Sequence, residues 1–122
     1  MTKHEQTVRN LGCIVCSLMQ RGYVAAHIHH CRFPVGMGQK ASQWYAIPLA
    51  PAIHQIGMMW PEWPWQSDVP IHAGDRPFRA RYGFGERELL WEVWQRLPYG
   101  PPVGVDDEAA LIDWLECKRN ES

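Results

Sequence analysis

The stretch Ala-His-Ile-His-His-Cys, residues 26–31, decides how this chain of 122 residues is interpreted. It closes a segment, residues 23–31, that is aromatic and β-branched at its start and has a period of two, and we predict a strand there. Side chains alternate between the two faces of a strand, so His27 and His29 share one face and His30 lies on the other. His29 and His30 therefore cannot both bind one metal ion unless the strand contains a bulge.

A second stretch with a histidine, Ile-Pro-Leu-Ala-Pro-Ala-Ile-His, occupies residues 47–54. Residues 44–49 predict a second strand, which follows a glycine-rich loop at residues 32–42. Pro51 suits the first turn of a helix, so we expect His54 on a short helix directly after the second strand. The order strand, loop, strand, short helix predicts an α+β fold with a ββα-metal core. Imidazoles from the first strand and the helix could hold one divalent ion there.

The remaining sequence predicts further helices within a single domain. In chain order, the other expected elements are a helix over residues 3–11, a tight apolar turn over 13–16, a loop over 58–70, an amphipathic helix over 86–97 and a C-terminal helix that begins at Asp106 or Asp107. We divide the chain into a domain at residues 1–97, a proline- and glycine-rich linker at 98–104, and a helix within 105–122 that packs on the same domain.

Charge is distributed unevenly along the chain, although the net charge is only −1. Residues 1–60 carry five Lys or Arg against one Glu, and residues 61–122 carry seven against twelve acidic residues. A nucleic acid would therefore be met by the first half and by a short arginine patch rather than by the acidic end. The predicted nucleic-acid contacts are Lys40, Arg76, Arg79 and Arg81. The alternative is ordinary surface variation, in which Arg79 and Arg81, spaced as on an exposed strand face, are simply solvated.

The sequence predicts a soluble, cytoplasmic protein without a membrane partner. The N-terminal residues are polar, and no stretch approaches the ~20 apolar residues of a membrane-spanning helix. Four cysteines are present, and in a reducing compartment structural disulfides are not expected. The Cys-x2-Cys pair of Cys13 and Cys16 therefore indicates a zinc site first and redox chemistry second.

Several stretches resemble the HNH nucleases, and among them the phage recombination-enhancement nucleases of the Ref type. They are Leu-Gly-Cys-Ile-Val-Cys (11–16), Ala-His-Ile-His-His (26–30), Val-Gly-Met-Gly-Gln (35–39), Ile-Pro-Leu (47–49), His54, Ile-His-Ala-Gly (71–74) and Phe-Arg-Ala-Arg-Tyr-Gly (78–83). The double histidine followed by Ile-Pro-Leu is a fairly specific combination. The Cys-x2-Cys pair is not, because many unrelated zinc modules contain it.

The resemblance implies an HNH, treble-clef-like fold and the cleavage of DNA phosphodiester bonds with one divalent ion. By this resemblance His29 is a catalytic metal ligand from the strand, His54 is the ligand from the helix, and His72 is a further histidine at the metal or the phosphate. His30 is the general base that activates water, and a positioned neutral imidazole contributes ~10²–10⁴ in rate. The ion would be Mg²⁺ or Mn²⁺ in the cell, with Zn²⁺ as an alternative captured on purification. A phage or prophage origin is implied in the same way, and a recombinase filament is a partner by family analogy only.

One feature of these relatives is missing. Treble-clef members hold a structural zinc with the Cys-x2-Cys pair and a second pair at the start of the helix, and that second pair falls here at Ala50 and Ile53. Two thiolates alone cannot complete the tetrahedral shell of a structural Zn²⁺. The cysteine pair is therefore expected to be two small buried thiols. The alternative is that Cys31 or Cys117 supplies replacement ligands.

Three tryptophans of the proline-rich loop, Trp60, Trp63 and Trp65, allow two interpretations. They could stack on unpaired bases, which is worth ~1–3 kcal/mol per base, or cover the core where the zinc is missing. As a whole the sequence predicts a metal-dependent DNA endonuclease or nickase. The alternatives are a non-catalytic DNA- or partner-binding module that keeps the fold and, less favoured, a structural metal-binding accessory protein.

Overall fold

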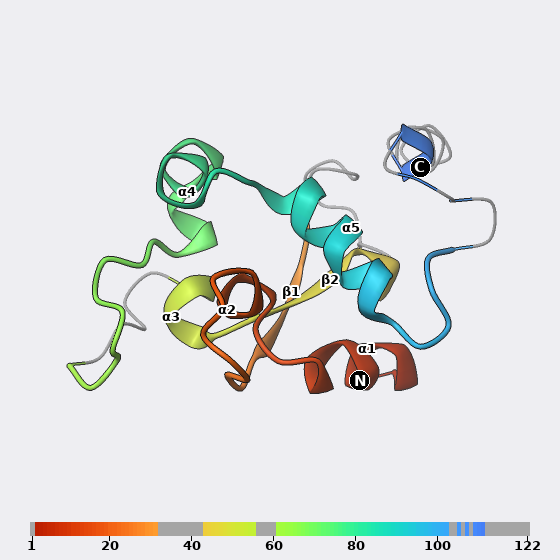
Figure 1. The fold of residues 1–122 in the computed structure, drawn as a ribbon, viewed down its shortest axis with the longest axis horizontal. Helices are drawn as coiled ribbons and strands as arrows, with labels where there is room; N and C mark the ends of the chain where they lie inside the picture. Colours follow the sequence, from red (N-terminus) through yellow and green to blue (C-terminus); the bar gives the residue numbers. More distant parts are fainter. Residues whose placement is uncertain are drawn as a thin grey trace.

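The computed structural model describes residues 2–31, 43–55, 61–102, 105, 107 and 109–111, which form a mixed α+β fold (Figure 1). The elements in chain order are α1 (Lys3–Asn10), α2 (Ile14–Leu18), β1 (His27–His30), the 3₁₀ turn η1 (Gln43–Tyr45), β2 (Ala46–Leu49), α3 (Pro51–His54), the 3₁₀ turn η2 (Ile71–Ala73), α4 (Asp75–Tyr82) and α5 (Glu86–Arg96).

Within the described residues, β1 and β2 form one antiparallel sheet. His27 pairs with Leu49, and His30 pairs with Ala46. The two predicted strands are confirmed in their C-terminal parts but are shorter than expected. β1 begins at His27 rather than at residue 23 because Leu49 is the last residue of its partner before the chain turns into α3. β2 begins at Ala46 because η1 precedes it.

The core lies where the helices meet β2, all of whose residues are buried. α1, α2 and α5 each contact β2, and Figure 1 shows these helices around the two strands. The apolar stripe of α5 supplies Leu89, Leu90, Val93 and Trp94, each with no exposed surface. The indole N–H of the buried Trp94 has a hydrogen-bond partner, because it donates to the carbonyl of Trp44 at 3.0 Å. The predicted helices over 3–11 and 86–97 are therefore confirmed, each ending one residue early.

The helix α4 corrects one interpretation of the sequence. The alternating spacing of Arg79 and Arg81 suggests an exposed strand face, but both residues lie on α4. Phe78 and Tyr82 lie four positions apart, and their rings meet at 4.7 Å between centroids, as neighbours on one helix face do. Gly83, with φ of 88°, adopts the left-handed conformation that ends the helix. The strand interpretation of the two arginines is therefore wrong, because Phe78, Tyr82 and Gly83 specify a helix.

Other expectations meet the structure in part. The predicted turn at residues 13–16 is instead a helix start, because Cys13 is the N-terminal cap of α2. Residues 61–70 contain neither helix nor strand, as the prolines predict. The rest of that loop, residues 58–60, and the loop at residues 32–42 lie outside the described residues.

The C-terminal region is described only in part. Residues 109–111 are helical and Leu111 is buried, which agrees with the predicted final helix at that point. The remainder of that helix and the proposed linker residues 103–104 lie outside the description, so the division into domain, linker and tail stays a prediction. Among the described residues, no helix combines the length and apolar character needed to cross a bilayer.

Candidate metal centre

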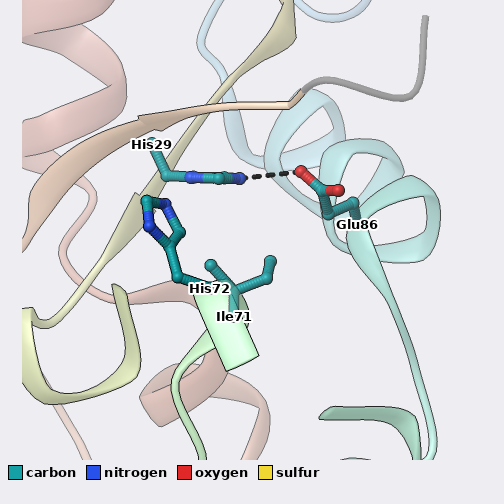
Figure 2. Close-up of a pocket in the computed structure, with 4 residues that line it drawn as sticks. All are labelled: His29, Ile71, His72 and Glu86. Carbon is teal, nitrogen blue, oxygen red and sulfur yellow. Dashed lines mark hydrogen bonds and ion pairs between the residues drawn. The ribbon is translucent and has the colours of Figure 1, made fainter. Parts of the chain in front are cut away.

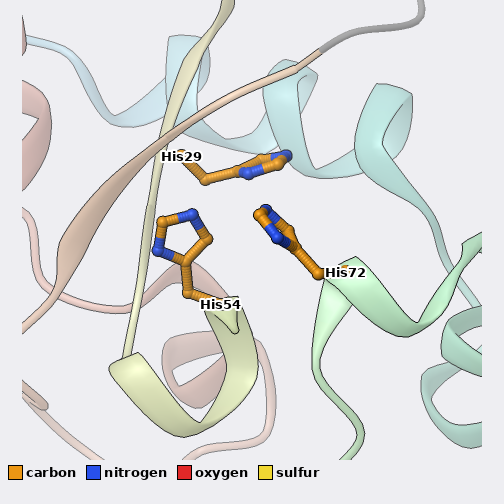
Figure 3. A group of neighbouring side chains, drawn as sticks. All are labelled: His29, His54 and His72. Carbon is orange, nitrogen blue, oxygen red and sulfur yellow. The ribbon is translucent and has the colours of Figure 1, made fainter. Parts of the chain in front are cut away.

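Three histidines from three separate elements meet at one point of the fold. His29 comes from β1, His54 from α3 and His72 from η2. A ligand nitrogen of each ring lies within 4.8 Å of the others. The ring centroids are 5.1 Å apart for His29 and His54, 5.4 Å for His29 and His72, and 4.9 Å for His54 and His72. Figure 3 shows the three rings turned toward a common space. We call these residues the histidine cluster.

Local structure explains why these side chains converge. His29 is the buried residue of β1, so its side chain points toward the core side of the sheet. Pro51 opens α3, and the backbone N–H of His54 donates to the carbonyl of Ala50 at 2.9 Å, which fixes the single turn that carries the ring. Ile71, which is 7% exposed, anchors η2 in the core and leaves the neighbouring His72 at the surface. The cluster is thus buried on two sides and open at His72.

The electrostatics of the cluster keep His54 neutral. Burial and the nearby imidazoles of His29 and His72 lower the pKa of His54 to about 4. One of its ring nitrogens, Nδ1, is buried without a hydrogen-bond partner in the described part of the chain. No protein group there fixes the proton to one nitrogen, so the ring can offer a free lone pair. Three converging imidazoles form a donor set that fits a divalent transition-metal ion.

A carboxylate that the sequence did not reveal joins the cluster from α5. Glu86 Oε2 lies 2.7 Å from His29 Nε2, and Figure 2 shows the two side chains facing each other. Together with Ile71, these two residues and His72 line a cavity of about 360 Å³. Glu86, His29 and Cys31 also form a second group whose ligand atoms lie within 4.8 Å. Glu86 is 57 positions from His29 along the chain, and no motif or spacing links the two.

The structure places His30 apart from the histidine cluster. As the alternation predicts, its ring lies on the face of β1 opposite to His29, and its Nε2 is 2.7 Å from Glu5 Oε2 of α1. The His30 side chain is 44% exposed. His27 shares the face of His29, and its ring centroid is 6.1 Å from that of His54. The adjacent pair is therefore split between a buried and an exposed environment, and the predicted role of His30 as general base stays a prediction.

The cysteine pair lies buried, next to the start of α2. The thiol of Cys16 hydrogen-bonds to Cys13 and lowers the pKa of Cys13 to about 7, and the same contact raises the pKa of Cys16. Ala50 and Ile53, where the resemblance to treble-clef nucleases implies a second ligand pair, are fully buried. Among the described residues, the groups able to hold a metal form around His29, and none includes Cys13 or Cys16. Both thiols are buried, and a structural zinc on this pair, which the sequence makes doubtful, would find no further ligand in this part of the chain.

The predicted nucleic-acid contacts are mostly engaged within the protein. Arg79 donates to Asp75 and to Glu88, at 2.9 and 2.6 Å, and Arg81 donates to the carbonyl of Ser67 at 3.0 Å. Arg76 is exposed, and Lys40 lies outside the described residues.

Two tryptophans of the proline-rich loop, Trp63 and Trp65, pack against the fold. Trp63 is buried, and Arg21 covers the ring of Trp65 at 4.3 Å from its centroid. These positions agree with the core-covering interpretation of the two rings. Trp60 lies outside the described residues.

One family of known proteins matches this chain. The family described as recombination enhancement, RecA-dependent nuclease, matches residues 2–97. The matched segment contains the histidine cluster, Glu86 and every helix and strand from α1 to α5. Comparisons with curated proteins and with solved structures give no match.

Proposed function

The chain belongs to the family of RecA-dependent nucleases of recombination enhancement, and from that membership we propose that it is a metal-dependent DNA endonuclease or nickase. In this proposal the β1–β2–α3 unit is an HNH-type ββα-metal core. The protein itself would be of phage or prophage origin. Phosphodiester bonds are hydrolysed with a single divalent ion. The observation that carries the proposal is the convergence of His29, His54 and His72 within 4.8 Å.

The histidine cluster would hold the ion through one nitrogen of each ring. Three imidazoles suit Zn²⁺ more than Mg²⁺, whereas water and phosphate oxygens are the ligands that Mg²⁺ and Mn²⁺ prefer. We propose Mg²⁺ or Mn²⁺ as the ion in the cell, where oxygens of the substrate phosphate and of water would complete the shell. The imidazoles themselves would favour the capture of Zn²⁺ on purification. His72 is the exposed member of the cluster, so this side is where a phosphate would approach.

The reaction needs a base, a cation and a held substrate. A bound divalent ion would stabilise the negative charge on the leaving oxygen. In this proposal His30 takes the proton of the attacking water. General-base action requires that the ring reach this water. His30 is exposed at the end of β1, so DNA could reach its ring. The contact of its Nε2 with Glu5 Oε2 would orient the ring.

DNA is the proposed substrate, and a recombinase filament is the proposed partner. Arg76, exposed on α4, and Lys40 are the proposed contacts with phosphates, while Arg79 and Arg81 retain their partners inside the fold. The dependence on a recombinase is taken from the description of the family. It is testable by supplying the filament separately from the metal.

A plasmid-nicking assay tests this function. Supercoiled plasmid is incubated with the protein and Mn²⁺ or Mg²⁺, with and without chelator, and with and without a RecA filament. We expect metal-dependent nicking that His54→Ala abolishes and that His30→Ala reduces by ~10²–10⁴. His27→Ala is the matched control, because His27 lies on the same strand face but outside the histidine cluster. Nicking retained in His54→Ala would refute the metal centre, and DNA binding without cleavage by the wild type would favour the non-catalytic module.

A further inference from the structure

We propose that Glu86 is the positioning residue of the metal centre: its carboxylate accepts a hydrogen bond from Nε2–H of His29 and so presents Nδ1 of that ring to the cation. The inference rests on the proposed function, because it assumes a cation at the histidine cluster. It adds Glu86, which is not one of the three histidines. It also assigns Nε2 of His29 to the hydrogen bond with Glu86 and Nδ1 of His29 to the cation.

The contact itself decides the tautomer of His29. The distance between His29 Nε2 and Glu86 Oε2 is 2.7 Å, at the short end for a hydrogen bond to a charged acceptor. An ionised carboxylate can only accept, so the proton of a neutral His29 must sit on Nε2. The lone pair then remains on Nδ1, and Figures 2 and 3 show the ring lying between Glu86 on one side and His54 and His72 on the other.

The spacing of the pair fits a hydrogen bond and not two ligands of one ion. Two ligands at the usual zinc distances are about 3.3 Å apart in a tetrahedral shell, and about 2.9 Å apart in the octahedral shell of Mg²⁺. The observed 2.7 Å is shorter than both. The second group, His29 with Cys31 and Glu86, also needs His29, which the histidine cluster already uses. We therefore assign Glu86 to the support of a ligand and not to the ion.

The surroundings hold the Glu86 carboxylate in place. Glu86 is the first residue of α5, and Leu89 and Leu90 of the same helix are fully buried, so the helix start cannot move freely. Behind it, the fully buried thiol of Cys31 lies within 4.8 Å of the Glu86 carboxylate. A carboxylate held at a helix start beside a buried side chain can orient the imidazole, as partners of metal-binding histidines commonly do.

His54 provides the internal contrast. Its Nδ1 has no hydrogen-bond partner among the described residues, whereas His29 has Glu86. Loss of Glu86 should therefore change the tautomer of His29 and leave that of His54 unchanged. This difference separates a positioning role from a general loss of structure.

The test combines the tautomer of the ion-free protein with ion affinity. Nitrogen-15 NMR of the histidine rings, recorded in the presence of chelator, should show His29 protonated at Nε2 in the wild type and in Glu86→Gln, whose amide oxygen still accepts. Glu86→Ala should lose this preference. Calorimetric titration with Mn²⁺ or Zn²⁺ should show affinity reduced ~10–100-fold in Glu86→Ala and less than ~10-fold in Glu86→Gln. Glu92→Gln, on the same helix, is the matched control and should change neither readout.

Two results would overturn the inference. One is a wild-type His29 protonated at Nδ1. The other is an affinity in Glu86→Gln as low as in Glu86→Ala, which would make Glu86 a ligand. Thermal unfolding of the ion-free variants confirms that each is folded. A wild type that binds no ion would refute the proposed metal centre, while the tautomer measurement, made without ion, tests the hydrogen bond separately.

Discussion

Arg21 and Asp68 form a buried, two-pronged ion pair in which both nitrogen–oxygen distances are 2.8 Å. The two side chains are 5% and 0% exposed. Trp63 donates to the same carboxylate at 3.0 Å, and Arg21 also reaches the sulfur of Cys16 at 3.8 Å. The pair therefore connects the chain after α2 to the tryptophan loop, beside Cys16 of the cysteine pair. We interpret it as a polar tie between these two segments.

Removal of Asp68 should strongly destabilise the fold. Asp68→Ala leaves the guanidinium of Arg21 buried without its counter-charge, and breaking a buried pair in this way costs ~3–5 kcal/mol. Urea unfolding measures the free energy. Asp75→Asn is the matched control, since the pair of Asp75 with Arg79 is exposed and should contribute under ~1 kcal/mol. Equal effects of the two substitutions would contradict the structural role of Arg21–Asp68.

Lowering the pH should remove the stabilisation that the Arg21–Asp68 pair gives to the fold. Burial raises the pKa of Asp68, but hydrogen bonds from Arg21, Trp63 and Tyr82 outweigh it, so the net pKa lies below 3.8. A carboxyl with a lowered pKa in the folded state stabilises the protein above its unfolded pKa, and this stabilisation is lost as the pH falls through the folded value. Stability should therefore drop below about pH 3.8, and the drop should be smaller in Asp68→Asn. Urea unfolding at a series of pH values measures the free energy of unfolding of both proteins. The same pH dependence in wild type and Asp68→Asn would contradict this prediction.

A divalent ion should stabilise the protein through the histidine cluster. Binding to the folded state alone adds about 2.7 kcal/mol at an ion concentration one hundred times Kd. Thermal unfolding with Mn²⁺ or Zn²⁺ and with chelator measures the shift in Tm. We expect the shift to disappear in His54→Ala and to persist in His27→Ala. An equal shift in wild type and His54→Ala would place the ion elsewhere.

Ion affinity and catalysis should separate between the two adjacent histidines. His30 lies on the opposite face of β1 from the cluster, so His30→Ala should keep nearly the wild-type ion affinity while nicking falls ~10²–10⁴. His29→Ala should lose both. Calorimetry and plasmid nicking on the same preparations measure the two quantities. A large loss of ion affinity in His30→Ala would make that ring a ligand and remove it as the base.

The cysteine pair should hold no zinc. Apolar Ala50 and Ile53 stand where the treble-clef resemblance implies the second ligand pair, and both are buried. Native mass spectrometry of the purified protein should therefore show no metal that Cys13→Ser releases, and any bound zinc should instead depend on His54. Zinc lost from Cys13→Ser but retained by His54→Ala would contradict the prediction.

Local patterns in the sequence predicted a good part of the fold. The helices at α1 and α5, the two strands and the short helix after Pro51 follow from apolar spacing and from residues that start or end elements. The alternation along β1 also places His29 and His30 on opposite faces of the strand. Such patterns are local, because they record only which face of one element is apolar and where that element ends.

Only the tertiary structure decided which distant residues meet. Glu86 reaches His29 across 57 positions and Asp68 reaches Arg21 across 47, and neither pair is visible in any spacing. Packing of α5 and of the tryptophan loop against the core brings these groups together. The same packing leaves His30 with Glu5 and outside the cluster. A sequence period fixes the direction of a side chain relative to its own element, whereas the group that it faces depends on how separate elements pack.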